Sequence, residues 1–300
     1  MNPETIEALR DRSIALSEEA DELLYDGDPD GAAVLYLQAL AIDEELAEAT
    51  GSSRDKRNLS ISLQQLAELE RETGDFDRAE ELAQRGLDIC EALVEEIDGM
   101  DERQDLALAY ISLSSVLLRK GAYMASENNA ARALAIAERN IREEENPDTR
   151  RQLSIALNRL CELRLLRGDA VAASIYLSRC LPIREALAAE LGSSIAYRDL
   201  SSTIIKMADI RYEMNDIDGA REHLMRALEI RLRLDDEVGT ADSRDDVGIV
   251  YMKLGYLTRP YDADMLQKAL DLYTELSERC PDMPQYAKYR DDLELVLFLL

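Results

Sequence analysis

A turn residue recurs through this sequence at a constant interval. A spacing of 47 residues separates the consecutive glycines Gly27, Gly74, Gly121 and Gly168, and Asn215 takes the next position in the series. Glycine, and after it asparagine, most readily adopts the left-handed backbone conformation that ends a helix. An acidic residue suited to cap a following helix comes next in four of the five copies, as Asp28, Asp75, Asp169 and Asp216. The interval therefore predicts a repeated helix–turn–helix unit.

Helical periodicity flanks each of these turns. In residues 57–73 leucines recur at steps of three and four, and residues 76–97 continue that spacing with smaller apolar side chains. Neither helix could bury its apolar stripe alone, so each hairpin needs a neighbouring hairpin. We therefore expect an all-α fold, a right-handed superhelical α-solenoid of about six antiparallel helix hairpins with a C-terminal capping helix.

Small residues mark the points where the two helices of each unit would pack. In the second copy they are Ala67, Ala79 and Gly86, at spacings of 12 and 7 residues. The corresponding sets are Ala20, Ala32 and Ala39; Ser114, Ser126 and Ala133; Cys161, Ala173 and Cys180; and Ala208, Ala220 and Ala227. This pattern resembles the tetratricopeptide repeat. A sixth, longer-turned copy has Gly255 and Ala269 at the small positions, Tyr273 at the aromatic position and Pro281 at the terminating proline.

The period of 47 residues exceeds the family's usual period of about 34. We attribute the excess to longer helices, similar to those of bacterial and kinesin-light-chain-like variants. We expect a single array over residues 1–300, because no joint is long or rich enough in Gly and Ser to act as a flexible linker. The predicted repeats cover residues 3–51, 52–98, 99–145, 146–192, 193–239 and 240–281, followed by a helix at 283–300.

The charge of the chain constrains its partners. With 62 acidic and 35 basic residues, its formal net charge is −27, which repels phosphates and disfavours nucleic acids and anionic membranes as partners. The sequence contains no apolar run of ~18 residues, and its first residues carry charges where a signal peptide needs an apolar core. We expect a soluble, cytoplasmic protein with solvated acidic faces, or one that also steers a basic partner towards itself.

Signals for chemistry are weak. His223 is the one histidine, and no nucleophile motif, phosphate-binding glycine loop or Cys/His metal cluster accompanies it. Cys161 and Cys180 occupy small packing positions, which favours buried thiols over a disulfide. A divalent cation held by Asp209, Glu213 and Asp216 is an alternative reading of the acidic composition. We expect no enzyme activity, no metal and no cofactor.

The resemblance implies a binding groove lined by the first helix of each hairpin. Counted from the small residue of each first helix, the groove positions are Gln64, Glu68, Arg71, Ile111, Ser115, Leu118, Asn158, Glu162, Leu165, Ile205, Asp209 and Tyr212. Apolar and acidic side chains alternate in this set, which suits a basic or amphipathic peptide or helix of another protein. Some family members bind a peptide carboxylate through lysines; here Gln64, Ile111, Asn158 and Ile205 stand at those positions, so a carboxylate clamp is not expected.

The C-terminal helix offers a second hypothesis. Its last residues are apolar on nearly every side, and such a helix needs to be buried. It could cap the last hairpin, or it could support self-association through Leu293, Val296, Leu297 and Leu300. The function predicted from the sequence is a protein-interaction scaffold or adaptor. The alternatives are a self-associating structural element and a regulatory module of a larger enzyme or signalling system.

Overall fold

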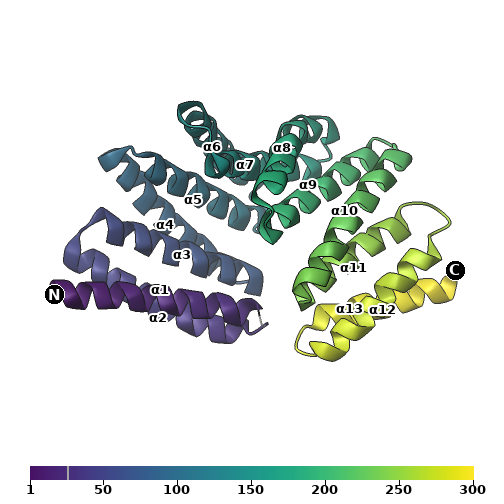
Figure 1. Ribbon diagram of the computed structural model, residues 1–300, viewed down its shortest axis with the longest axis horizontal. Coiled ribbons are helices and arrows are strands. Elements are labelled where there is room, and N and C mark those ends of the chain that lie inside the picture. Colours follow the sequence, from purple (N-terminus) through teal and green to yellow (C-terminus); the bar gives the residue numbers. More distant parts are fainter. Residues whose placement is uncertain (26) are drawn as a thin grey trace. The chain divides into compact units, whose positions relative to one another are not determined.

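A computed structural model describes residues 1–25 and 27–300, and within these ranges the chain forms thirteen helices and no strand (Figure 1). It divides into two compact units, unit 1 (Met1–Leu163) and unit 2 (Arg164–Leu300), with the division inside one helix. The helices of unit 1 are α1 (Pro3–Tyr25), α2 (Pro29–Thr50), α3 (Ser53–Thr73), α4 (Phe76–Ile97), α5 (Met100–Arg119), α6 (Tyr123–Glu143) and most of α7 (Pro147–Leu166). Those of unit 2 are α8 (Ala170–Leu191), α9 (Ser194–Glu213), α10 (Ile217–Val238), α11 (Ala241–Tyr256), α12 (Ala263–Arg279) and α13 (Pro284–Leu299).

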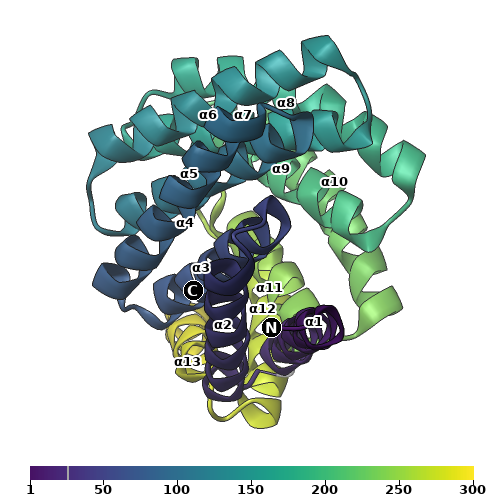
Figure 2. The same ribbon diagram turned by 90° about the vertical axis from the view of Figure 1, so that its left-hand side faces the viewer.

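The predicted fold class, an all-α solenoid of consecutive helix hairpins, is confirmed. In unit 1 each helix from α1 to α6 packs against the next, and in unit 2 the same holds from α8 to α13. The hairpin of α1 and α2 can be followed in both ribbon views (Figures 1 and 2). Short connections separate successive hairpins, at residues 51–52, 98–99, 144–146, 192–193 and 239–240.

The periodic turn residues adopt the backbone conformation that their spacing predicts. The φ angles are 84° at Gly27, 97° at Gly74, 76° at Gly121, 73° at Gly168 and 61° at Asn215. A residue with a Cβ atom is strained in this region, whereas glycine is not, and asparagine tolerates it better than most. The 47-residue interval is therefore the interval between the turns of successive hairpins.

The aspartates that follow the turns cap the second helices. The side chains of Asp28, Asp75, Asp169 and Asp216 each accept a hydrogen bond from the backbone N–H three residues further on. Ala122, the exception in the sequence, makes no such side-chain bond at the start of α6. The start of α7 is capped in the same way, since Asn146 Oδ1 accepts from the Thr149 N–H at 2.9 Å. Each cap satisfies a backbone donor that the helix itself leaves unpaired.

Small side chains let the helices of a hairpin approach closely. Ala67 and Ala79 are fully buried where α3 crosses α4, and a Cβ added at Gly86 would lie 3.4 Å from the Ser60 carbonyl oxygen. The last full hairpin is tighter, because a Cβ at Gly255 would lie 2.4 Å from a Leu266 methyl carbon. The small positions inferred from the sequence are therefore contact points between helices.

The C-terminal helix α13 packs against α12 and covers the end of the last hairpin. Tyr286 and Leu293 are buried beside Tyr273, while Val296 and Leu297 are half-buried at the edge of the same core. Of the four residues proposed for self-association, Leu293 is thus engaged inside unit 2, and Leu300 is the one that is exposed.

Candidate functional site

The first helices of the hairpins in unit 1 form a face that carries several of the predicted groove residues; we call it the first-helix face of unit 1 (α1, α3, α5 and α7). On α3, the Arg71 guanidinium donates to Glu68 at 2.9 Å and to Glu72 at 3.3 Å. The hydrogen bonds to Glu68 raise the pKa of Arg71, and the charge of Glu162 on α7 adds to the effect. Gln64 donates its side-chain amide to the Ser60 carbonyl at 3.2 Å. The face is therefore organised electrostatically across α3 and α7.

A second polar link joins α5 to α7 on this face. Arg159 donates to the Ser115 hydroxyl at 2.6 Å and to the Glu162 carboxylate at 2.8 Å, and Ser115 donates to the Ile111 carbonyl at 2.8 Å. Arg159 was not among the residues predicted from the sequence, although it lies next to the predicted Asn158. The structure brings Ser115 and Glu162 together through this arginine.

The other predicted groove residues of these helices are half-buried. On α5 they are the apolar Ile111 and Leu118; on α7 they are the polar Asn158 and, in the last turn, which belongs to unit 2, Leu165. Half-buried aliphatic groups flanked by paired ions can contact an amphipathic segment without losing an internal partner.

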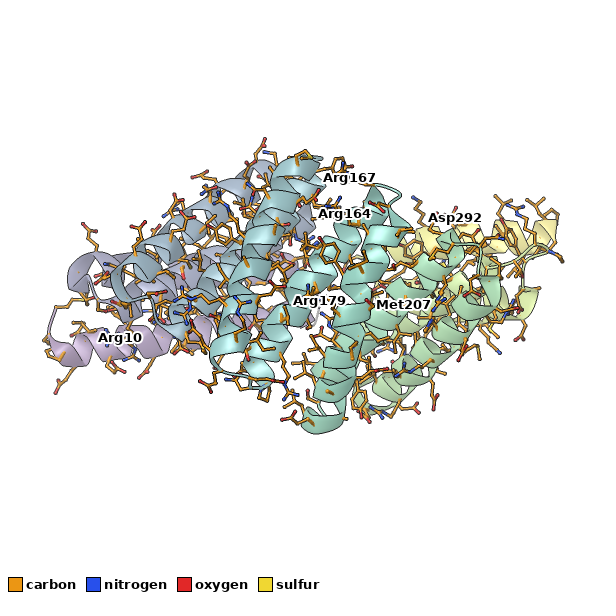
Figure 3. All side chains as sticks on the ribbon, turned by 90° about the horizontal axis from the view of Figure 1, so that it is seen from above. Arg10, Arg164, Arg167, Arg179, Met207 and Asp292 are labelled. Carbon is orange, nitrogen blue, oxygen red and sulfur yellow. The ribbon has the colours of Figure 1, made fainter. Side chains whose placement is uncertain are left out.

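A bidentate ion pair fixes the first two hairpins of unit 1 to each other. Arg10 on α1, labelled in Figure 3, donates two hydrogen bonds of 2.7 Å to the two oxygens of Asp55 at the start of α3. The Asp55 side chain is fully buried, and it also accepts from the Thr50 and Ser52 hydroxyls at 2.5 Å and 2.7 Å. These bonds, led by those from Arg10, hold the pKa of Asp55 well below its ordinary value.

A pocket of about 230 Å³ lies between α1, α2 and α3, and sequence analysis did not identify it. Asp43 of α2 lies in its wall and is 2% exposed. One carboxylate oxygen of Asp43 accepts from Ser13 at 2.9 Å and from Ser62 at 2.5 Å, whereas no hydrogen-bond donor reaches the other. Burial raises the pKa of Asp43 despite these two bonds.

Unit 2 carries a larger and more apolar pocket. It has a volume of about 560 Å³ and includes two of the predicted groove residues, Asp209 and Tyr212 of α9. The other side chains come from α11 and α13 and the buried core beside them, among them Ile249, Met252, Tyr256 and Tyr289. Lys253 donates to Asp209 at 2.7 Å. Ile205, the third predicted residue of α9, is half-buried and packs against the cores on either side of it.

A neighbouring depression of about 630 Å³ shares Tyr212, Tyr256 and Leu257 with this pocket. Its aromatic wall is ordered by an edge-to-face contact of Tyr256 and Tyr261, with ring centres 5.1 Å apart, and by the Arg259 guanidinium 4.6 Å above the Tyr261 ring. Aromatic side chains of this kind offer apolar contact area together with a hydroxyl group. We call the two depressions together the tyrosine pocket.

The acidic residues considered for a metal site are already engaged. Asp209 pairs with Lys253, while Asp216 caps α10 and accepts from Arg211 at 3.2 Å. Across residues 1–25 and 27–300, no group of three or more His, Cys, Asp or Glu side chains is arranged to hold a metal ion. The alternative of a divalent cation at Asp209, Glu213 and Asp216 is therefore wrong for this geometry.

His223 and the packing cysteines have structural surroundings. His223 is half-buried on α10, and burial, with the charge of Arg211, lowers its pKa. Cys161 and Cys180 are fully buried, as expected for small packing positions, and burial raises the pKa of Cys180. A thiol with a raised pKa is a poor nucleophile at neutral pH.

No helix in the described ranges combines the length and the apolar character that a membrane crossing requires.

Comparisons with known proteins identify the repeat. Residues 61–98 match the family model of the tetratricopeptide repeat. No curated protein matches the chain. Several solved structures match the chain, and three of them are given below with their shared coverage.

The structure of BtubC (BKLC) from P. vanneervenii is 19% identical over 96% of this chain and 92% of that one, with a TM-score of 0.53. A STAND protein with a tetratricopeptide repeat sensor, from Pyrococcus horikoshii, is 17% identical over 98% of this chain, with a TM-score of 0.54. The chain spans 40% of that protein. A Rap protein complexed with Competence and Sporulation Factor is 15% identical over 96% of this chain and 74% of that one, with a TM-score of 0.59.

These matches confirm the resemblance seen in the sequence. At such low identities the solved structures show a shared fold, and the family model identifies residues 61–98 as a tetratricopeptide repeat. Arrays of this kind present extended surfaces and typically serve as interaction modules.

Proposed function

We propose that this protein is a non-enzymatic interaction module whose first helices hold a basic or amphipathic segment of another protein. One observation carries the proposal most directly. Asp209 and Tyr212, two of the groove positions that the family resemblance implies, line a pocket of about 560 Å³ in unit 2. A volume of this size is typical of sites that enclose a small ligand or a few side chains.

The surroundings of the tyrosine pocket fit an apolar anchor from a peptide. Ile249, Met252 and Tyr256 supply adaptable apolar contacts, and Lys253 is already neutralised by Asp209. On the first-helix face of unit 1, Arg71 and Arg159 are likewise paired with glutamates, so the arginines there do not form an open anion site. A segment that combines apolar and basic residues matches both surfaces.

The fold supports the same proposal by analogy. The Rap protein that shares it was solved in complex with Competence and Sporulation Factor. We infer that this chain, too, binds a segment of another molecule.

Selection from a library of random peptides displayed on phage tests the proposal on the full chain. We expect enriched sequences in which Lys or Arg alternates with aromatic or aliphatic residues. Synthetic versions should bind in fluorescence anisotropy, and binding should be lost on Met252→Lys, which places a charge in the tyrosine pocket. Met225→Lys is the matched control, because Met225 is 47% exposed on α10 and does not line that pocket. Failure to enrich any sequence, or equal binding by both variants, would contradict the proposal.

Self-association remains a second candidate because of one feature of α13. Phe298, Leu299 and Leu295 are 86%, 72% and 60% exposed, on the side of the helix away from its buried Leu293. Light scattering of the full chain beside Phe298→Ser tests this candidate. A single mass equal to one chain for both proteins, across a hundredfold range of concentration, would remove it.

A further inference from the structure

We propose that the pocket between α1, α2 and α3 receives the ammonium group of a lysine side chain from the bound segment. This inference rests on the proposed function and adds to it a specific contact. It is carried by a buried carboxylate oxygen of Asp43 that has no donor, by a wall without basic residues, and by the absence here of the base that the fourth and later copies carry at the same repeat phase.

Asp43 is the residue that a cation would satisfy. It is 2% exposed and lies in the wall of the pocket, and its Oδ1 atom receives no hydrogen bond. Ser13 and Ser62 both donate to Oδ2 and hold the carboxylate in place from α1 and α3. Buried carboxylate oxygens normally have a donor, and one without a donor is unfavourable until a donor arrives. An ammonium group brings three donors and a compensating charge.

The wall of the pocket carries negative charge alone. Glu18 and Asp21 of α1 join Asp43, the remaining residues are neutral, and no Lys or Arg lines the pocket. Ile14 and Ile61, 48% and 41% exposed, stand on either side of the opening. The butyl stem of a lysine can lie against such aliphatic groups while its charged end reaches inward.

The size of the pocket selects among cations. Its volume of about 230 Å³ is below the range of ~300–1,000 Å³ typical of small-molecule sites. A guanidinium group needs a planar, two-pronged acceptor, whereas the pocket offers a single unpaired oxygen, which suits the compact ammonium group better. A metal ion is disfavoured, since the described residues contain no suitable group of three ligands.

A comparison of equivalent positions in successive repeats indicates that this pocket has no basic side chain of its own chain, so its cation would come from a bound molecule. Steps of 47 residues relate Glu18 and Gln65 of the pocket to Arg159 and Lys253 further along the chain. In those later hairpins the base pairs with a carboxylate of the first-helix face, Arg159 with Glu162 and Lys253 with Asp209. In the first three hairpins an acid, an amide and a serine (Ser112) stand in its place. The carboxylates of the pocket therefore lack the internal base that later copies supply.

The pocket also lies on the face that the proposed function assigns to the partner. Ile14, Ser17 and Asp21 of α1 are one period before Ile61, Gln64 and Glu68 of α3. Gln64 and Glu68 are among the predicted groove residues. A segment bound along α1 and α3 would thus pass the opening of the pocket.

The direct test uses a probe that needs no identified partner. N-acetyl-lysine N-methylamide is titrated into the full chain and followed by amide NMR, with N-acetyl-norleucine N-methylamide as the uncharged comparison. We expect the lysine probe to shift the amides of Ser17, Ser62 and Gln65 and to lower the pKa of Asp43, and we expect the norleucine probe to do neither. Equal effects from the two probes would overturn the inference.

Variants distinguish a binding role from a structural one. Asp43→Asn keeps the shape and removes the charge, and it should weaken the lysine probe by about tenfold or more. Ile61→Ser changes the opening at a half-exposed position without touching Asp43, and it should weaken the probe a few-fold. The amide spectrum shows whether Asp43→Asn alters the fold. If it does, Ile61→Ser still tests the inference, because unchanged binding of the lysine probe by that variant contradicts it.

These experiments distinguish a failure of the lysine-pocket inference from a failure of the proposed peptide-binding function. If the lysine probe binds but no peptide is ever enriched, the pocket is a cation site and the peptide proposal falls. If peptides are enriched but replacing each of their lysines by norleucine leaves affinity unchanged, this inference falls and the proposed function stands.

Discussion

The first-helix faces of the two units are built from the same repeat but present different chemistry. In unit 1 the exposed side is polar, with Arg71 and Arg159 tied to glutamates and a small acidic pocket at Asp43. In unit 2 the equivalent helices frame the tyrosine pocket, which is larger and whose 560 Å³ depression is mostly apolar. The repeat phase selects the same positions in both units, while the side chains at those positions differ, so under the proposed function the two units would bind different parts of a partner.

The difference also extends to how each face is held in place. Unit 1 relies on buried ions and hydroxyls, such as Arg10 with Asp55 and the serines around Asp43. In unit 2 the helices of the tyrosine pocket rest on aromatic packing, with the rings of Tyr273 and Tyr289 5.0 Å apart, and buried ions such as Arg231 with Asp246 lie elsewhere in the unit. Ionic and apolar supports respond differently to mutation, pH and salt, so the comparison can be tested.

The largest expected effect is the loss of the buried ion pair in unit 1. Arg10→Ala leaves the fully buried Asp55 without its cation, and removal of one partner of such a pair typically destabilises a protein by ~3–5 kcal/mol. Urea unfolding followed by circular dichroism measures the change. Arg54→Ala is the matched control, because Arg54 pairs with Glu7 at an exposed site, where the loss should be below ~1 kcal/mol. Similar losses for both variants would show that the ion pair does not support unit 1 as argued.

The next effect concerns binding at unit 2. Met252→Lys introduces a charge among apolar side chains of the tyrosine pocket, and loss of an anchor contact of this kind typically weakens binding by ~2 kcal/mol or more. Fluorescence anisotropy with a selected peptide should show this loss, and Met225→Lys should bind as the unmodified chain does. If Leu118→Arg on α5 of unit 1 abolished binding while Met252→Lys did not, the apolar anchor would have to be assigned to unit 1 instead.

The two buried carboxylates of unit 1 predict opposite responses to acid. Arg10 lowers the pKa of Asp55, so the stability it contributes is present above the ordinary pKa and is lost as pH falls through the lowered one. Burial raises the pKa of Asp43, so its unfavourable charge is relieved as pH falls through the raised value. The stability difference between the unmodified chain and Arg10→Ala should therefore shrink in acid.

The stability difference between the unmodified chain and Asp43→Asn should change with pH in the opposite direction. Relative to this variant, the unmodified chain should gain stability as pH falls towards the ordinary pKa of Asp43, by at most ~1.4 kcal/mol per pH unit. Unfolding experiments that run from neutral pH to well below the ordinary aspartate pKa of about 3.9, on all three proteins, measure both differences. The same sign for the two variants would contradict the assignment of one stabilising and one destabilising carboxylate.

Most of the fold could be predicted from residue type and spacing within each hairpin. The turn at Gly74, the cap at Asp75 and the small packing residue Ala79 each follow from residue type and spacing, and the structure places all three as expected. The groove positions Asp209 and Tyr212 follow from the family resemblance and the repeat phase, and both line the 560 Å³ pocket of unit 2. Whether all twelve predicted positions contact a partner remains a prediction.

Asp43 illustrates what the sequence could not reveal. It lies on a second helix in the segment IDEELAEA and reads as one of many solvated acids. Its burial results from contact with Ser13 and Ser62, which are 30 and 19 residues away and have no local link to it. Arg159 was missed for a related reason, because its bond to Ser115 spans 44 residues and depends on how α5 and α7 pack.

The smallest expected effect tests whether charge on the first-helix face of unit 1 acts on the partner. Glu162→Gln removes the carboxylate that pairs with Arg159 and acts on Arg71, and at a partly exposed site the stability loss should stay below ~1 kcal/mol. The face becomes more positive, so a lysine-containing peptide should bind about two- to threefold more weakly at low salt, and the difference should fade at high ionic strength. Glu95→Gln, an exposed change on α4, is the control for net charge. If it weakened the peptide as much as Glu162→Gln, the partner would respond to the total charge of the protein and the polar character of unit 1's face would have no special role.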